Sequence, residues 1–329
     1  LLWFGYDKLI LFSGLSFVVA VIIRIIYQVY CRRNFKESKY NFEYDNRYFK
    51  ELIAYSGWNL FGTLSLVAKN QGVNMILNLF FGTLVNAAYG IAMQVQAAVT
   101  QFVSSFQMAI NPQIIQSYAA DNKDKTVNLM FLGAKLSYVL MLVIVFPLIL
   151  NTEYILELWL GKVPDNTIIF IRLVLVSILI DAISGPFMTG IIATGKIKKY
   201  NVTIGILNLT ILPLSYLLLN LNYDTTSVFF LLVMLSVISL CFRVRFILNI
   251  FHFSFLTLIK RLFIRLLPLT FFSCILEYYL FVNRYQSFSF VILSTALLLV
   301  FVAIISFITI LNEKERRSVV FFVRSKFKK

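Results

Sequence analysis

The chain has 329 residues, of which 60% are hydrophobic and 14% charged, with a formal net charge of +15, and its mean hydropathy is +0.83. A soluble domain of this length is nearer half apolar and could not bury so much apolar surface. The composition excludes a soluble globular enzyme, and the apolar runs of about 20 residues predict an all-α, polytopic transmembrane helix bundle, because a helix of that length crosses a bilayer.

Nine apolar spans are predicted along the chain. In order they are Leu9–Tyr30, Ser56–Phe81, Val85–Ile110, Val127–Leu150, Ile168–Ala193, Val202–Leu219, Val228–Phe242, Leu266–Val282 and Phe288–Leu311.

Lysine and arginine are distributed unevenly between alternate connections. One side of the predicted bundle carries 23 of them and the other side 3, and the remaining 4 lie within spans. By the positive-inside rule, this places the carboxy-terminal tail in the cytoplasm and the amino terminus outside. The basic charge is therefore interpreted as a topology signal with affinity for anionic membrane lipid, not as a nucleic-acid interface.

The chain begins with Leu1 and without a preceding signal peptide, which we interpret as a carboxy-terminal fragment of a longer protein. The three cysteines, Cys31, Cys241 and Cys274, lie at or inside spans and predict no disulfide framework.

The connections predicted outside the membrane are short. The longest runs from Asn151 to Thr167 and includes Trp159, which is typical of a short interfacial helix with a headgroup anchor. The chain's one histidine, His252, lies in a basic cytoplasmic connection, and no metal-ligand spacing, phosphate-binding loop or Ser/His/Asp set is present. An enzyme is disfavoured, and neither a metal nor another cofactor is expected.

Polar side chains within the second and third spans follow helical spacing. Each such group costs a few kcal/mol or more at the bilayer centre, so by default it faces water or protein. Asn59, Thr63, Asn70, Asn74 and Asn78 share one stripe, flanked by Lys69 and Gln71. The third span has a similar stripe with Gln96, Thr100, Ser104, Gln107 and Asn111, and a neighbouring one with Gln94 and Gln101.

Two interpretations of these stripes stay open. Amides and hydroxyls of two adjacent helices would line one cavity that suits a hydroxyl-rich sugar, with Lys69 as the cation for an anionic group. Alternatively, the amides join helices across a dry interface. The predicted cavity residues are Lys69, Asn70, Gln71, Asn74, Asn78, Gln94, Gln96, Gln101, Gln107 and Arg172.

The fifth span contains both Arg172 and Asp181. They are nine residues apart, on opposite sides of a helix, so they cannot pair with each other. Asp181 is aligned with Ser177 and Ser184 and is the candidate site for a coupling cation, either a proton or Na⁺. Arg172 either binds substrate or extends to the outer interface, whereas Arg24 and Lys135 are expected to extend to the cytoplasmic interface.

Several motifs together resemble those of Wzx-type polysaccharide flippases, which belong to the multidrug/oligosaccharidyl-lipid/polysaccharide exporter superfamily. The resemblance covers most of the chain from Glu51 to about Phe242, whereas the last two spans are similar only in hydropathy and position. The residues that carry it lie in the segments 55–62, 69–74, 78–82, 85–92, 111–114, 158–161 and 193–198.

The resemblance implies a domain organisation. The family has fourteen spans in two six-helix lobes plus a final pair. Residues 1–50 would then be the last helix of the amino-terminal lobe and the cytoplasmic linker. Residues 51–250 would be the carboxy-terminal lobe, and residues 251–329 the additional helix pair and basic tail.

The resemblance also implies a function. It predicts a multi-pass inner-membrane transporter that flips undecaprenyl-diphosphate-linked oligosaccharide by alternating access, for the assembly of O-antigen or another surface polysaccharide, alone or with other polysaccharide-assembly membrane proteins. Open alternatives are a multidrug exporter or a peptidoglycan-precursor flippase of the same superfamily, and, from another class, a membrane glycan polymerase or ligase.

Overall fold

The computed structural model of the chain describes residues 8–35, 38, 44–282 and 288–309. The predicted outer loop at 283–287 and the basic tail from 310 to 329 lie outside the described residues. The described residues are almost entirely helical and contain no strand, which confirms the all-α fold class. The chain divides into two compact units, Leu1–Ile53 and Ala54–Lys329.

The helices follow one another with short connections. Their bounds are α1 Lys8–Asn34, α2 Asn46–Ala119, α3 Lys123–Leu160, α4 Thr167–Ala193, α5 Lys198–Asn220, α6 Thr226–Phe251, α7 Phe255–Leu258, the π-helical turn η2 Ile259–Phe263, α8 Ile264–Val282 and α9 Phe288–Thr309.

Eight of the nine predicted apolar spans fall within these helices. The ninth, Phe288–Leu311, coincides with α9 as far as Thr309, and its last two residues lie outside the described residues. The second and third predicted spans both lie in α2, which is 74 residues long and is interrupted at Gly82. Gly82 has φ +73° and ψ −164°, a combination open essentially to glycine alone. The chain reverses at this glycine, so α2 consists of two helical segments.

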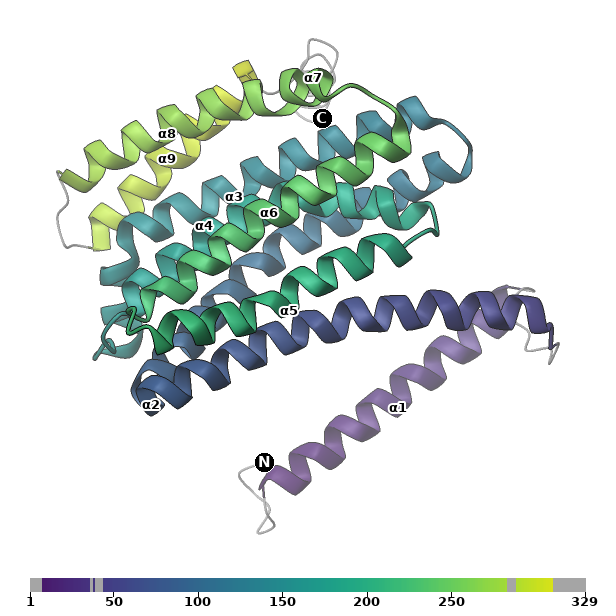
Figure 1. Cartoon of the computed structure of the whole chain (residues 1–329), viewed down its shortest axis with the longest axis horizontal. Coiled ribbons are helices and arrows are strands. Elements are labelled where there is room, and N and C mark those ends of the chain that lie inside the picture. The colour runs from purple at the N-terminus through teal and green to yellow at the C-terminus, as the bar shows by residue number, and fades with distance from the viewer. Residues whose placement is uncertain (1–7, 36–37, 39–43, 283–287, 310–329) are drawn as a thin grey trace. The chain divides into compact units, whose positions relative to one another are not determined.

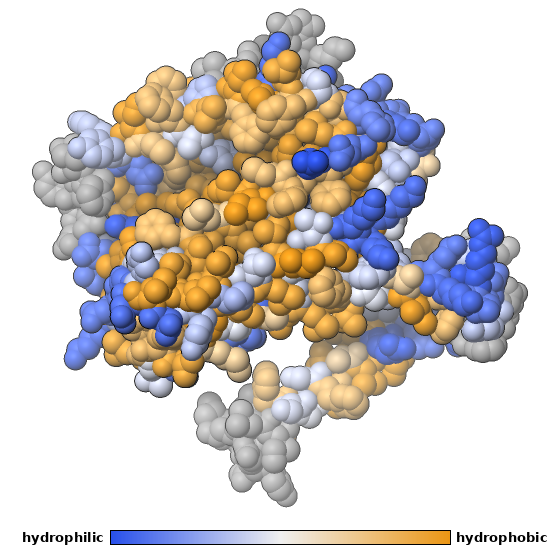
Figure 2. All heavy atoms as spheres, viewed as in Figure 1, coloured by the Kyte–Doolittle hydropathy of each residue, from blue (hydrophilic) through white to orange (hydrophobic). Residues whose placement is uncertain are grey.

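Seven helices are long and apolar enough to cross a membrane by length and composition: α1, α2, α3, α4, α5, α6 and residues 289–306 of α9. In the second unit, apolar side chains cover the middle of the face seen in Figure 2, and hydrophilic residues gather toward the helix ends. These features indicate an integral membrane protein. The count of nine spans and their orientation stay predictions.

The core of the second unit lies between α3, α4 and α6, which run side by side in Figure 1. Phe170 of α4 stacks on Phe229 of α6 with ring centroids 3.9 Å apart, and Phe131 of α3 packs edge-on against Phe187 of α4 at 6.0 Å. Gly133 of α3 lets the helices approach closely, because a Cβ there would lie 3.0 Å from Cγ of Pro186. Small residues at such contacts are typical of membrane helix packing.

The two segments of α2 are joined to each other and to α5. The Tyr89 hydroxyl donates a hydrogen bond of 3.0 Å to the backbone carbonyl of Asn70, so it bridges the two segments across the Gly82 reversal. Gly72 of the first segment lies directly against the Leu212 side chain of α5. The first segment of α2 therefore packs tightly along α5.

The helices α8 and α9 pack on α3. The Tyr138 and Thr270 hydroxyls are 2.7 Å apart and join α3 to α8, while Nδ2 of Asn151 donates to Ser294 of α9 at 3.5 Å. Asn151 also breaks the helical geometry of α3, which continues to Leu160 with Trp159 exposed. The short helix expected in this connection is thus the last part of α3.

Candidate functional site

A polar cavity of about 560 Å³ lies in the second unit between both segments of α2 and helices α4, α5 and α6. Its volume is within the range of about 300–1,000 Å³ that is usual for small-molecule sites. The polar and charged residues that line it are Asn59, Thr63, Lys69, Thr100, Ser104, Asp181, Ser184, Tyr200, Asn201, Asn208, Ser236, Ser239 and Arg243.

Each helix contributes to the cavity through residues that recur about every three or four positions, together with a direct neighbour on α5, and such residues lie on one side of a helix. On α6 this face carries Ser236, Ser239 and Arg243, and on α5 it carries Tyr200, Asn201 and Asn208. The other faces of these helices are apolar, so they pack in the core or remain exposed. The cavity is therefore built by amphipathic helices whose polar faces converge.

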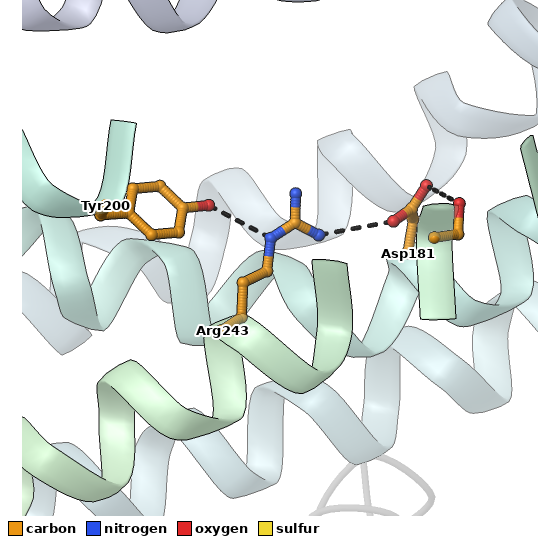
Figure 3. Close-up of polar contacts among 4 residues, drawn as sticks. Asp181, Tyr200 and Arg243 are labelled. Carbon is orange, nitrogen blue, oxygen red and sulfur yellow. Dashed lines mark hydrogen bonds and ion pairs between the residues drawn. The ribbon is translucent and has the colours of Figure 1, made fainter. Parts of the chain in front are cut away.

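Arg243 is the centre of a hydrogen-bonded chain that crosses three helices (Figure 3). Its Nε donates to the Tyr200 hydroxyl at 3.1 Å, and its Nη1 lies 3.4 Å from Oδ1 of Asp181. The Ser236 hydroxyl donates to Oδ2 of the same carboxylate at 3.2 Å. Asp181 of α4 is thus held from α6 by a hydroxyl and a guanidinium.

The two members of this ion pair differ in exposure. The Arg243 side chain is 15% exposed, whereas the Asp181 side chain is 48% exposed. Arg243 is further fixed by Tyr200, which is 3% exposed. The cation is therefore the shielded and anchored partner, and the carboxylate is the accessible one.

Lys69 is the second cation of the cavity. It is half-buried, and within the described part of the chain it makes no hydrogen bond or salt bridge, although Asp181 attracts it and Arg243 repels it electrostatically. Two cations and one carboxylate are the charged residues in the cavity lining, which leaves one positive charge in excess. An unpaired cation in a low-dielectric site is costly, so the cavity favours an anion.

Helices α2 and α5 are also joined beside the cavity. Nδ2 of Asn201 donates to the backbone carbonyl of Trp58 at 3.0 Å, and Nζ of Lys198 lies 4.7 Å above the centre of the Trp58 ring. A Cβ on Gly62 would lie 3.2 Å from Cγ of Asn201, so the glycine permits this close approach. These contacts hold the first segment of α2 against α5 where the cavity is lined by both.

The structure places Lys69 and Asp181 in this one cavity, but it separates the other predicted site residues from its lining. Asp181 has its partners on α6 instead of on its own helix, since Ser177 donates to the backbone carbonyl of Leu173. Gln94 lines a separate, mainly apolar pocket of about 790 Å³ with residues of α3 and α9. The predicted site residues that do not line the polar cavity are Asn70, Gln71, Asn74, Asn78, Gln94, Gln96, Gln101, Gln107 and Arg172.

Two amides of the third predicted span join helices. Nε2 of Gln107 donates to the Ser137 hydroxyl of α3 at 3.2 Å, and Oδ1 of Asn111 accepts from Thr189 of α4 at 2.9 Å. Thr100 and Ser104 of the same span line the cavity. In this helix, some polar residues of the stripe join helices and others line the cavity, so each of the two interpretations describes a part of it.

Arg172 and Lys135 lie away from the cavity. Arg172 is half-buried, its Nε makes no hydrogen bond with the described residues, and its electrostatic partner is Glu277 of α8. Lys135 is 3% exposed and sits in the interior of the second unit. Its side chain is thus enclosed by protein, and its extension to the cytoplasmic interface stays a prediction.

Sequence reasoning missed Arg243, Tyr200 and Ser236 as site residues. The predicted span ended at Phe242, so Arg243 was counted with the cytoplasmic charges, whereas α6 continues to Phe251. The spacing of Ser236, Ser239 and Arg243 on one helical face was the available signal.

Among the described residues, no group of three or more His, Cys, Asp or Glu side chains is arranged to hold a metal ion. The cavity offers hydroxyls, amides, one ion pair and the ammonium of Lys69 to a ligand.

Comparison with known proteins gives one family match. Residues 64–217 match the family model MatE, which represents the multidrug/oligosaccharidyl-lipid/polysaccharide exporter superfamily. No curated protein and no solved structure matches the chain significantly. The match includes Lys69, Asp181 and Tyr200 but ends before Ser236 and Arg243. The similarity to MatE covers somewhat less than half of the chain, and it supports a membrane exporter or transporter.

Proposed function

We propose that the protein is a secondary transporter that flips undecaprenyl-diphosphate-linked oligosaccharide across the inner membrane by alternating access. The observation that carries this proposal is the excess cation of the cavity: Lys69 and Arg243 face a single carboxylate among hydroxyls and amides. A diphosphate supplies the missing negative charge, and a sugar supplies hydrogen-bonding groups that match the lining.

The proposed roles follow from the chemistry of each side chain. Lys69 and Arg243 bind the diphosphate, because ammonium and guanidinium groups form charge-assisted hydrogen bonds with phosphate oxygens. Asn59, Asn201 and Asn208 contact the sugar through amides that both donate and accept. Asp181 remains our candidate for the site of a coupling proton or Na⁺.

The proposed domain organisation places the cavity in the carboxy-terminal lobe, residues 51–250. In this proposal, residues 1–50 and 251–329 are the preceding helix with its linker and the additional helix pair with its tail. The MatE match lies wholly within the proposed lobe. The partners that we propose are the lipid-linked glycan, the surrounding lipid and other membrane proteins of polysaccharide assembly.

A multidrug exporter fits the family match equally well. Cationic amphiphiles would bind Asp181, which is accessible, but they would be repelled by Lys69 and Arg243. The excess positive charge favours the glycan carrier, and it suits a peptidoglycan precursor equally, since that cargo also carries a diphosphate. A glycan polymerase or ligase has no support from the site.

The test replaces Lys69 in the complete protein, expressed in a strain whose surface glycan depends on it. Loss of a charge-assisted contact worth roughly 1.5–3 kcal/mol should lower surface glycan in Lys69→Ala by about tenfold or more at matched protein level. Lys69→Arg should retain most of the glycan. Lys162→Ala is the matched control, because Lys162 is exposed in the connection between α3 and α4.

Surface glycan that is unchanged in Lys69→Ala would overturn the role of Lys69 in cargo binding. Loss of resistance to cationic drugs, with intact surface glycan, would identify the multidrug alternative.

A further inference from the structure

The ion pair between Arg243 and Asp181 is asymmetric in a way that matters for an anionic ligand. Arg243 uses Nε to reach Tyr200 and Nη1 to reach Asp181, while its Nη2 makes no hydrogen bond with the described residues. The contact to Asp181 is long, at 3.4 Å, and the carboxylate is about half exposed. The guanidinium is thus held firmly at Nε by Tyr200, whereas its Nη atoms have only the long contact to Asp181 (Figure 3).

We propose that Asp181 is a displaceable internal anion that occupies Arg243 while the cavity is empty and leaves it when a phosphate of the cargo binds. This inference rests on the anionic cargo of the proposed function. It assigns the guanidinium edge formed by Nη1 and Nη2 as the phosphate site, because two parallel N–H donors match the spacing of two phosphate oxygens.

The energetic reason is the cost of an unpaired charge. A guanidinium that is mostly shielded from water is strongly destabilising unless an anion compensates its charge. Asp181 compensates Arg243 in the empty cavity, and the phosphate does so in the loaded cavity. The released carboxylate remains close to Lys69, whose ammonium attracts it. Both the empty and the loaded protein therefore keep Arg243 paired.

Tyr200 makes this exchange possible. Its hydroxyl accepts from Nε, so the guanidinium keeps its position when the carboxylate leaves. The Ser236 hydroxyl, which donates to Oδ2, stabilises the occupied state. Removing the Ser236 hydrogen bond should therefore strengthen binding of the anionic ligand to Arg243. Removing the Tyr200 hydrogen bond should weaken that binding.

The proposal separates binding from turnover. Removing the carboxylate should tighten anion binding, because the competitor is gone. It should also slow transport, because the empty protein would have to change conformation with Arg243 unpaired. A purely structural ion pair would give the opposite result for binding, since its loss would disorder the site.

The binding test uses inorganic pyrophosphate and the complete protein in lipid nanodiscs, with calorimetry as the readout. Asp181→Asn should bind pyrophosphate about tenfold more tightly than the unmodified protein, which corresponds to about 1.4 kcal/mol. Ser236→Ala should bind about twofold more tightly, Tyr200→Phe several-fold more weakly, and Arg243→Gln should lose measurable binding. Asp165→Asn is the control, since it removes the same charge from an exposed connection.

The transport test measures flipping of the lipid-linked oligosaccharide in proteoliposomes. Asp181→Asn should show a lower KM together with a maximal rate several-fold lower. Size-exclusion profiles and melting temperatures of all variants show whether the comparison is between folded proteins.

The outcomes separate the two proposals. If Arg243→Gln loses pyrophosphate binding while Asp181→Asn binds no more tightly, the displaceable anion is overturned and the proposed function stands. If Asp181→Asn binds pyrophosphate more tightly while the unmodified protein flips no lipid-linked oligosaccharide in proteoliposomes, the internal anion is supported and the proposed cargo fails. If pyrophosphate binds without any dependence on Arg243, the phosphate site assigned here is overturned.

Discussion

Polar side chains of this bundle have three different surroundings. Ser105 and Thr203 donate to carbonyls four residues earlier on their own helices, Gln107 joins two helices, and Arg243 lines the cavity. The sequence around these residues does not distinguish the three kinds of surroundings. A hydroxyl that bonds its own helix is satisfied wherever the helix lies, so its position alone does not reveal a cavity.

For the same reason, only part of the candidate site was predictable from the sequence. Lys69 and Asp181 could be identified because a charge inside an apolar span requires an explanation. Asn70 and Asn78, by contrast, are exposed on α2 in the second unit, and their positions in the sequence gave no sign of this exposure. Which helix faces another depends on packing between distant segments, which one sequence does not contain.

At the residue scale, Asp224 gives a prediction about pH. Its carboxylate accepts hydrogen bonds from the Thr226 hydroxyl at 2.9 Å and the Thr225 amide at 2.7 Å, in the connection before α6. These bonds, the Thr226 one foremost, lower the pKa of Asp224 below its ordinary value of 3.8. A lowered pKa means that the ionised carboxylate stabilises the fold above pH 3.8 and that this stabilisation is lost as the pH falls below it.

We therefore expect Asp224→Asn to melt at a lower temperature than the unmodified protein at neutral pH. The difference should shrink as the pH is lowered below 3.8, since the wild-type carboxyl then also becomes neutral. Thermal unfolding between neutral and acidic pH measures this. A difference that stays constant over the whole range would show that ionisation of Asp224 does not contribute.

At the scale of elements, the apolar runs predicted where helices occur but not where they end. The helices α2, α3 and α6 extend several residues beyond the predicted spans, since polar residues continue a helix outside the apolar stretch. Helix extension beyond Phe242 is what brings Arg243 into the site. The reversal at Gly82 was correctly placed between two spans, because a glycine there is compatible with a turn.

Gly82 also gives a prediction at this scale. No other atom lies within 4 Å of a Cβ built at Gly82, so an alanine there has space, but its φ of +73° remains unfavourable for any residue with a Cβ. Gly82→Ala should destabilise the protein by about 1–3 kcal/mol. Gly90→Ala, in the helical part of α2 and equally free of neighbours, should instead be neutral or stabilising by about 0.5–1 kcal/mol.

Unfolding in detergent, followed by loss of helical signal, compares the two variants. Equal effects of both substitutions would mean that the backbone geometry at Gly82 is not what determines the stability of the reversal.

At the scale of the whole molecule, the charge distribution predicts an orientation that can be measured. The connection between α3 and α4 should lie outside the cell, and the one between α2 and α3 in the cytoplasm. A membrane-impermeant maleimide should label a cysteine at Asp165 in intact cells but label one at Lys123 only after permeabilisation. Cys31, Cys241 and Cys274 are first replaced by serine, because free thiols would react as well. The reverse labelling pattern would show that the orientation is wrong.

The Tyr89–Asn70 hydrogen bond has a mechanical consequence. It fastens the two segments of α2 to each other, and these segments carry Lys69 on one side and Thr100 and Ser104 on the other. We expect the two segments to move as one rigid body relative to α4 and α6. The Lys69 ammonium and the hydroxyls of Thr100 and Ser104 would then keep their positions relative to one another. The width of the cavity would then depend on one joint movement of the two α2 segments and not on a separate movement of each.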